Sequence, residues 1–235
     1  MAKQLLGKEV TAALNERIKA DVAALKEKGV NPTLGISHVG ERPDDLSYER
    51  GATKRCETLG VEYKKYLLPE DVSQEELLKV IDEVNKDDNI HGVLMFRPLP
   101  KHIDQNVVEN ALAAEKDVDC QTDASLGGVF TGKQVGFPPC TPQACMEILD
   151  HYGIDCTGKK AVVIGAGFIG LEAAENLQAR GINVTVIDFA SQILPNILDP
   201  EMAAYAKKHL LNAGIRVITG TSAEEILGTD KVTGV

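Results

Sequence analysis

Apolar residues recur along this chain with two different periods, one typical of helices and one of buried strands. Near the N-terminus they recur every three to four positions, which predicts an amphipathic helix ending near Gly29. The residues of this stripe are Val10, Leu14, Ile18, Val22 and Leu25. Further along, short apolar runs predict strands, and the stretches between them predict helices. The predicted strands are 33–39, 61–67 and 90–96, and the predicted helices are 45–59 and 73–85.

This alternation of helix and strand predicts an α/β domain with a parallel sheet, whose ligands should lie beyond the carboxyl ends of the strands. Ser73 and Glu76 have the spacing of a capping box at the start of the helix over 73–85. Residues 104–140 show weaker periodicity, and Leu126-Gly127-Gly128 predicts a glycine-rich loop. Thr141 and Pro142 are typical of an N-cap and first helical residue.

Residues 161–188 predict a complete strand–turn–helix–strand unit that holds a dinucleotide. The strand over 161–164 runs into glycines at GxGxxG spacing, and a second strand over 184–187 ends at an acidic residue. The first glycine allows a tight turn, the second lets the backbone approach a pyrophosphate, and the third lets the helix pack closely on the strand. The predicted cofactor contacts are Gly165, Ala166, Gly167, Phe168, Ile169, Gly170 and Asp188.

Asp188 also predicts which dinucleotide binds. Its carboxylate can accept hydrogen bonds from an adenosine ribose, whereas a 2′-phosphate at the same place would be repelled by about 4 kcal/mol at 4 Å. No Arg or Lys follows in residues 189–192 to neutralise it. We therefore expect NAD to be favoured over NADP.

Composition excludes several classes of protein. The 235 residues are 43% hydrophobic, enough for two modest domains, and the net charge of −10 argues against a nucleic-acid or anionic-membrane surface. No apolar run approaches the ~20 residues of a membrane span, and the N-terminus lacks the apolar core of a signal peptide. We expect a cytoplasmic protein.

The five cysteines form an odd, scattered set without a CxxC pair, which argues against a disulfide framework and against a zinc site. We expect free thiols and no metal. Cys140 and Cys145 have the spacing of a redox-active pair in some flavin disulfide reductases, but the predicted helix start at Thr141 disfavours that interpretation.

The first 160 residues resemble the bifunctional methylenetetrahydrofolate dehydrogenase/cyclohydrolase family. The motifs that carry the resemblance occur in the family's order over about two-thirds of the chain. They are Val39-Gly40 with Pro43 and Ser47-Tyr48, Leu68-Pro69-Glu70, His91-Gly92-Val93-Leu94, PLPKHID at 98–104, KDVD at 116–119 and PCTP at 139–142. The resemblance implies a catalytic α/β domain that holds a reduced folate against a nucleotide domain, where hydride passes to the nicotinamide.

The resemblance also assigns roles. Tyr48 matches the tyrosine that stacks on the folate, Asp119 matches the aspartate that hydrogen-bonds the pterin, and Pro98, Leu99 and Pro100 match the pocket wall. Taken without the resemblance, Asp119 reads as a solvated loop acid and Tyr48 as a half-buried helix aromatic.

Two departures from the family concern proton transfer. The family's catalytic lysine follows the tyrosine by four residues, but Ala52 stands there, and the nearest lysine, Lys54, should point about 240° away from Tyr48. Phe96 and Arg97 stand where the family has the glutamine that pairs with this lysine. Cyclohydrolase activity, which needs positioned proton transfer, is therefore in doubt.

These matches to the family's motifs, and the departures from them, give the candidate residues of the site. The catalytic candidates are Tyr48, Lys54 and Asp119, and the folate-binding candidates are Tyr48, Arg97, Pro98, Leu99, Pro100 and Asp119. Arg97 is the favoured cation because it ends a strand, whereas Arg50 and Lys54 read equally well as surface cations.

Beyond residue 161 the chain resembles the NAD domain of pyridine nucleotide-disulfide oxidoreductases, where Glu172 matches a glutamate near the nicotinamide. Asp199-Pro200 and Asn212-Ala213-Gly214 predict the two ends of a further helix, and 215–220 a strand. Residues 224–235 resemble the opening of that family's antiparallel excursion. We expect this domain to be incomplete at its C-terminus, through truncation or engineering, or because another subunit covers the edge.

We therefore predict a two-domain α/β protein: a folate-binding catalytic domain over 1–140 with a parallel sheet, and a Rossmann-like NAD-binding domain over 141–235. The predicted function is that of an NAD(P)-dependent methylenetetrahydrofolate dehydrogenase, acting as a homodimer on a reduced folate. Two alternatives stay open: a folate- or nucleotide-binding protein with impaired catalysis, and a fragment related to flavin disulfide reductases. The second is disfavoured because no GxGxxG for FAD stands near the N-terminus.

Overall fold

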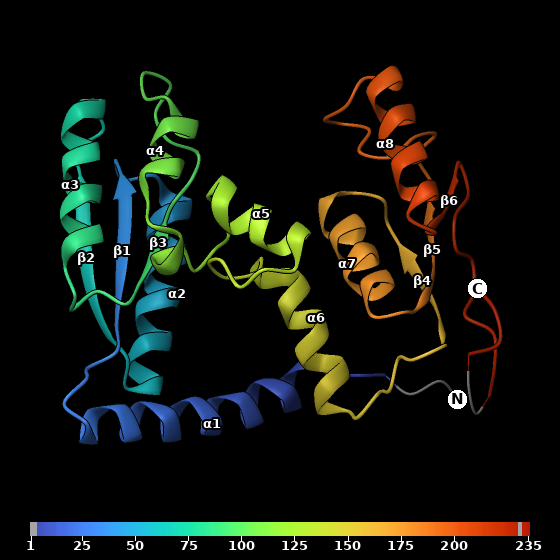
Figure 1. Ribbon diagram of the computed structural model, residues 1–235, viewed down its shortest axis with the longest axis horizontal. Coiled ribbons are helices and arrows are strands. Elements are labelled where there is room, and N and C mark those ends of the chain that lie inside the picture. The colour runs from blue at the N-terminus through green and yellow to red at the C-terminus, as the bar shows by residue number, and fades with distance from the viewer. Residues whose placement is uncertain (1–3, 230–231) are drawn as a thin grey trace. The chain divides into compact units, whose positions relative to one another are not determined.

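Two compact units make up the chain in a computed structural model that describes residues 4–229 and 232–235. One unit is Thr11–Cys140, and the other combines the described residues of 1–10 with those of 141–235. Helix α1 (Gly7–Glu27) contributes to both. Figure 1 shows the elements, which confirm the predicted α/β class with two parallel sheets.

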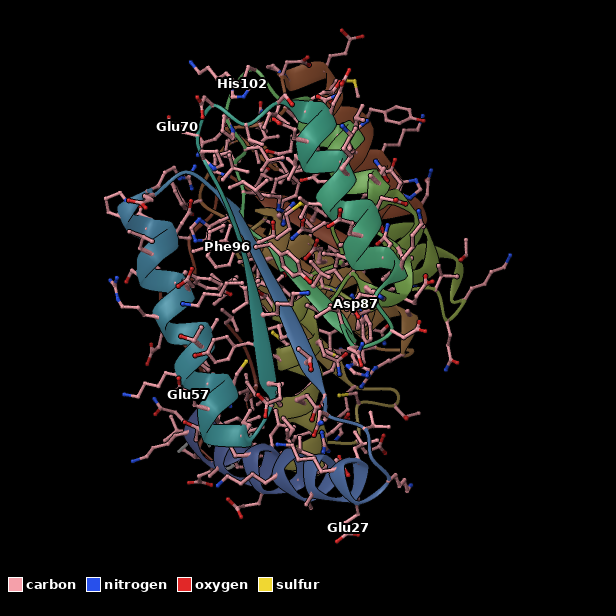
Figure 2. The ribbon with its side chains drawn as sticks, turned by 90° about the vertical axis from the view of Figure 1, so that its left-hand side faces the viewer. Glu27, Glu57, Glu70, Asp87, Phe96 and His102 are labelled. Carbon is pink, nitrogen blue, oxygen red and sulfur yellow. The ribbon has the colours of Figure 1, made fainter. Side chains whose placement is uncertain are left out.

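The sheet of the first unit contains three parallel strands in the order β2-β1-β3. The strands are β1 (Thr33–Val39), β2 (Glu62–Leu68) and β3 (Gly92–Met95). Helices α2 (Pro43–Leu59) and α3 (Gln74–Lys86) lie on opposite faces of this sheet, as Figure 2 shows. Strand β1 has the predicted bounds, while β2 and β3 differ by one or two residues at their ends.

Local signals fixed the ends of several helices. Ser73 and Glu76 form the predicted capping box of α3, in which the Ser73 side chain accepts from the Glu76 backbone N–H.

In the core of this unit, the apolar face of α3 packs against the sheet. Fully or nearly fully buried members of this core include Leu77, Ile81, Val84, Ile90, Val93 and Val108.

The segment with weak periodicity is more ordered than predicted. It contains α4 (Gln105–Ala111), a 3₁₀ turn (Ala114–Lys116) and α5 (Asp123–Thr131). The prediction of a glycine-rich loop at 126–128 was wrong, because these residues lie inside α5. Thr122 caps this helix, and a β-carbon at Gly128 would come within 2.6 Å of the Val135 carbonyl oxygen. Close packing, and not flexibility, requires glycine there.

The second unit contains a parallel sheet in the order β4-β5-β6. Its strands are β4 (Lys160–Ile164), β5 (Asn183–Asp188) and β6 (Arg216–Thr219), and its helices are α6 (Cys140–His151), α7 (Phe168–Ala179) and α8 (Pro200–Asn212). Asp199 caps α8 by accepting from the Met202 N–H, as predicted. Edge strand β4 leaves Val162 and Ile164 43% and 59% exposed.

The N-cap predicted at Thr141 was misplaced, because α6 begins at Cys140 and Thr141 lies within its first turn. In the C-terminal segment, Leu227 and Gly234 form an antiparallel bridge, while residues 230 and 231 of the predicted excursion lie outside the described residues. No helix in the described part of the chain is long and apolar enough to cross a membrane.

Candidate active site and dinucleotide loop

A cavity of about 600 Å³ opens in the first unit at the carboxyl end of β3. The segment that leaves β3 forms one side, and the first turns of α2 form the other. Its lining includes Arg42, Asp45, Tyr48, Met95, Phe96, Arg97, Pro98, Gln105 and Asp119. The structure therefore brings together four of the predicted site residues, Tyr48, Arg97, Pro98 and Asp119. Leu99 and Pro100 line an adjoining hollow of about 260 Å³.

Tyr48 stands at the mouth of the cavity with 64% of its surface exposed. Its ring meets the ring of Phe96 edge-on, with 5.4 Å between centroids and an interplanar angle of 78°. Phe96 is buried, and Figure 2 shows it on the side of the sheet that faces α2. An aromatic pair thus forms one wall, with the face of Tyr48 available to a planar ligand.

A second hollow, of about 610 Å³, continues along α2 from Tyr48 and is lined by Ala52 and Arg55. Residues four and seven positions after Tyr48 share its helix face. Lys54 is exposed on α2, but it does not belong to the lining of the described hollows. These hollows therefore bring Tyr48 and Asp119 into the lining without Lys54. Arg55, which the sequence interpretation missed, is the cation on the face of Tyr48.

Arg97, which lines the cavity, forms ion pairs with two acidic side chains. Its guanidinium lies 3.4 Å from Asp119 Oδ2 and 3.3 Å from Glu109 Oε1. Gln121 Nε2 donates to the Met95 carbonyl at 2.8 Å and lies 3.4 Å from the same Asp119 oxygen. These contacts hold the carboxylate of Asp119 in one orientation while leaving a third of its side chain exposed.

Arg42 is a further residue that the sequence interpretation missed. It precedes α2 and donates to the carbonyl oxygens of Arg97 and Pro98, at 3.3 and 3.1 Å, and to Asp45 Oδ1 at 3.0 Å. Two segments 55 residues apart are thereby joined at the cavity rim. Nothing in the local sequence around Arg42 predicts this contact, because it depends on the pairing of β1 with β3.

Behind the aromatic wall lies a buried polar group that was also missed. His38 Nε2 lies 2.8 Å from Glu49 Oε2, and Lys65 Nζ donates to Glu49 Oε1 at 2.6 Å. The hydrogen bond from Lys65 lowers the pKa of Glu49, and the contact with His38 lowers it further, against the opposing effect of burial. Glu49 is therefore a carboxylate at neutral pH.

The dinucleotide loop of the second unit has the geometry that the GxGxxG spacing predicts. Gly165 has a backbone φ of +109°, which residues other than glycine rarely adopt. Gly167 is the N-cap of α7 and has an extended backbone conformation. A β-carbon at Gly170 would collide with the carbonyl oxygen of Gly165, whereas one at Gly167 would meet no atom within 4 Å. The loop thus packs closely on the strand at Gly170 and stays open at Gly167, as a pyrophosphate requires.

Asp188 ends β5 beside this loop. Its carboxylate accepts from the backbone N–H of Ala166 and, at 2.7 Å, from that of Ala190, and it is 9% exposed. The Ala166 N–H is therefore committed to Asp188. The donors left for a phosphate are the N–H groups of Gly167, Phe168 and Ile169, which a helix start leaves without intrahelical partners.

Glu172 and the cysteines contribute less to the candidate site. Burial raises the pKa of Glu172, and repulsion by Glu175 raises it further. Burial likewise raises the pKa of the Cys140 thiol, and the nearby Asp119 carboxylate adds to this effect. No disulfide bond involves Cys56, Cys140, Cys145 or Cys156. Among the described residues, no group of three or more His, Cys, Asp and Glu side chains could hold a metal ion.

Comparison with known proteins divides the chain in the same way as its motifs. Residues 5–119 match the family described as tetrahydrofolate dehydrogenase/cyclohydrolase, catalytic domain, and residues 160–235 match pyridine nucleotide-disulphide oxidoreductase. The bifunctional protein FolD of Carboxydothermus hydrogenoformans is 46% identical over 198 residues, 84% of this chain and 69% of that protein. The corresponding protein of Alkaliphilus oremlandii is 41% identical over 198 residues, 84% of this chain and 70% of its own.

Solved structures agree with this assignment. The bifunctional dehydrogenase/cyclohydrolase FolD from Campylobacter jejuni has a TM-score of 0.72 and 29% identity, covering 93% of this chain and 91% of that one. The Trypanosoma brucei methylenetetrahydrofolate dehydrogenase-cyclohydrolase, complexed with NADP and an inhibitor, has a TM-score of 0.69 and 28% identity. This match covers 94% of this chain and 72% of the Trypanosoma brucei chain.

Proposed function

The chain belongs to the tetrahydrofolate dehydrogenase/cyclohydrolase family of one-carbon folate metabolism, and we propose that it oxidises 5,10-methylenetetrahydrofolate with NAD as the hydride acceptor. The observation that carries this proposal is the cavity at the end of β3, whose lining includes both the exposed Tyr48 ring and the Asp119 carboxylate that Arg97 holds. An aromatic face and a carboxylate suit the planar ring system of a folate and its N–H donors.

The residues that line the cavity would each make a different contact with the folate. Tyr48 offers a stacking surface, Asp119 accepts hydrogen bonds from the pterin, and Arg97 holds Asp119 in one orientation. Pro98, Leu99 and Pro100 form an apolar wall held by Arg42. Hydride transfer needs the donor carbon to be held close to the acceptor and aligned with it, and needs little acid–base chemistry from the protein.

The loop at 165–170 fits a dinucleotide, which supplies the hydride acceptor when bound. The N–H groups of Gly167, Phe168 and Ile169 would hold its pyrophosphate, with Gly165 and Gly170 shaping the turn around the buried Ala166. Asp188 supports NAD over NADP because its buried carboxylate would repel a 2′-phosphate. Asp188 also accepts two backbone hydrogen bonds, which fix its position for a ribose hydroxyl.

Cyclohydrolase activity should be weak. Ala52 lines the hollow beside Tyr48 where the family has its lysine, and the buried ring of Phe96 replaces the partner glutamine. Loss of a positioned general acid or base typically costs about 10²–10⁴ in rate. The same observation favours a second candidate function, a folate-binding protein whose catalysis is impaired.

We propose further that the domains divide their roles as 1–140 for the folate and 141–235 for the dinucleotide, and that the protein acts as a cytoplasmic homodimer. A second copy would cover the apolar side chains that β4 leaves exposed. Sedimentation velocity at micromolar concentration measures this assembly directly.

The deciding experiment follows two activities in the same preparation. Reduction of NAD and of NADP with 5,10-methylenetetrahydrofolate measures the dehydrogenase, and loss of the methenyl product's absorbance above the spontaneous rate measures hydrolysis. We expect NAD reduction with little hydrolysis, and a gain of hydrolysis in Ala52→Lys. Folate binding without reduction of either dinucleotide would support the binding protein instead.

A further inference from the structure

Three aromatic rings connect the cavity to the interior of the first unit. The imidazole of His38, on β1, stacks on Phe96 with 5.6 Å between centroids and 17° between planes. Phe96 in turn meets Tyr48 edge-on at the cavity mouth. A displacement of His38 would therefore move the ring on which the wall of the cavity rests.

His38 is itself held at both ring nitrogens. Nδ1 lies 2.8 Å from the Gly40 carbonyl oxygen, and Nε2 lies 2.8 Å from Glu49 Oε2. Both partners can only accept, so each contact is a hydrogen bond when the facing ring nitrogen carries the proton, and rotation of the ring would break the contact at both nitrogens. Only 2% of His38 is exposed, which leaves little water to replace a lost partner.

Glu49 joins this ring to a second strand and to the helix of Tyr48. It immediately precedes Arg50 and follows Tyr48 on α2, and its carboxylate binds His38 of β1 and Lys65 of β2. Neighbouring helix residues point about 100° apart, so fixing Glu49 on the sheet also fixes the direction of Tyr48. The contacts of Glu49 with His38 and Lys65 thus act as an anchor that sets the rotation of α2 about its own axis.

Stability alone is a poor reason for such an anchor. Burying charged groups costs desolvation free energy, and well-packed apolar residues often stabilise a protein as well as a buried ion pair does. A hydrogen-bonded charge network, in contrast, admits one geometry. None of His38, Glu49 and Lys65 belongs to the described lining of the cavity, so their effect must pass through Phe96 and Tyr48.

We propose that His38, Glu49 and Lys65 are positioning residues for the aromatic wall, which set the affinity for the folate without touching it. The inference rests on the proposed function. It predicts that damage to the network raises the KM for the folate while leaving kcat and the KM for NAD nearly unchanged.

Two neighbouring lysines provide the test and its control. Lys65→Met removes the ion pair with Glu49, whereas Lys64→Met removes an ion pair with Asp87 on the other face of the same strand. We expect Lys65→Met and Glu49→Gln to raise the folate KM about tenfold, with less than a twofold change in kcat. Lys64→Met should have the wild-type folate KM and kcat. Lys65→Arg, which keeps a cation beside Glu49, should retain the wild-type folate KM.

The outcomes separate this inference from the proposed function. Calorimetric titration with tetrahydrofolate, without dinucleotide, measures the affinity of each variant directly, and thermal melts identify folded variants. Lys65→Met is the mild change, because this side chain is 36% exposed. Wild-type folate affinity in folded Lys65→Met and Glu49→Gln, or a loss confined to kcat, would overturn the positioning role. If the wild type itself binds no reduced folate, the proposed function fails with it.

Discussion

Substituting Gly167 by valine should separate dinucleotide binding from folding. The backbone at Gly167 has φ −80° and ψ −178°, which any residue can adopt, and a β-carbon there meets no atom within 4 Å. Valine is a poorer N-cap than glycine, but it loses less backbone entropy on folding. The two effects oppose each other, so the free energy of unfolding should change by no more than about 1 kcal/mol.

Binding should change much more. The open space at Gly167 is where a pyrophosphate must approach the first N–H groups of α7. A hydrogen bond to a charged group contributes about 1.5–3 kcal/mol, so loss of a single one weakens binding about tenfold to a hundredfold. Valine blocks more than one of these donors, and the Kd for NAD should rise at least a hundredfold.

Two glycine variants provide the controls. Gly7→Ala also adds a β-carbon in open space but lies outside the loop, so NAD affinity should persist. In Gly170→Ala the new β-carbon would collide with the Gly165 carbonyl, so the second unit should melt at a lower temperature. Titration calorimetry with NAD and with tetrahydrofolate, beside thermal melts, checks all three variants. Unchanged NAD affinity in folded Gly167→Val would refute the assignment of this loop to a pyrophosphate.

Three further predictions concern single residues. Asp188→Ser should narrow the preference for NAD over NADP, and equal wild-type Kd values for the two would contradict the role given to Asp188. Arg55→Ala should raise the folate KM while Lys54→Ala leaves it unchanged, because only Arg55 shares the face of Tyr48; steady-state kinetics with equal effects would reverse this distinction. Burial raises the pKa of Asp117, but hydrogen bonds from the Gln121 and Thr122 backbones outweigh it, so the pKa is lowered in the folded state. The stability that Asp117 contributes is present above its unfolded pKa of about 3.9 and is lost as the pH falls through the lower folded pKa. Urea midpoints between pH 2 and 6 should show this loss in the wild type and a smaller one in Asp117→Asn.

Features that depend on neighbouring residues could be predicted from the sequence. Strand β1, the capping box at Ser73 and the cap at Asp199 each follow from side chains within a few positions, and all three are confirmed. The GxGxxG turn belongs to the same class. Its conformation is set by glycines that lie next to one another in the chain, and β4 and α7 frame it as predicted.

Features that depend on strand pairing could not be predicted. Glycine has low helix propensity, yet α5 contains Gly127 and Gly128 because the return of the chain at Val135 leaves no room for a larger side chain at Gly128. Arg42 likewise meets the Pro98 carbonyl only because β1 and β3 are paired. One signal could have indicated the buried network, since His38 is a titratable residue in β1, a strand with no Asp, Glu, Lys or Arg.

The substitutions around the cavity make chemical sense together. We propose that Ala52 and Phe96 stand where the family has its proton-transfer pair, while His38 and Glu49 lie behind the aromatic wall. Hydrolysis of a methenyl folate needs a proton moved at the reacting atoms, whereas hydride transfer needs two reactants held in one orientation. A rigid aromatic wall with its polar groups on the far side serves the second requirement and not the first. On this proposal the site serves alignment of a ring system, which is the reason to expect oxidation without efficient hydrolysis.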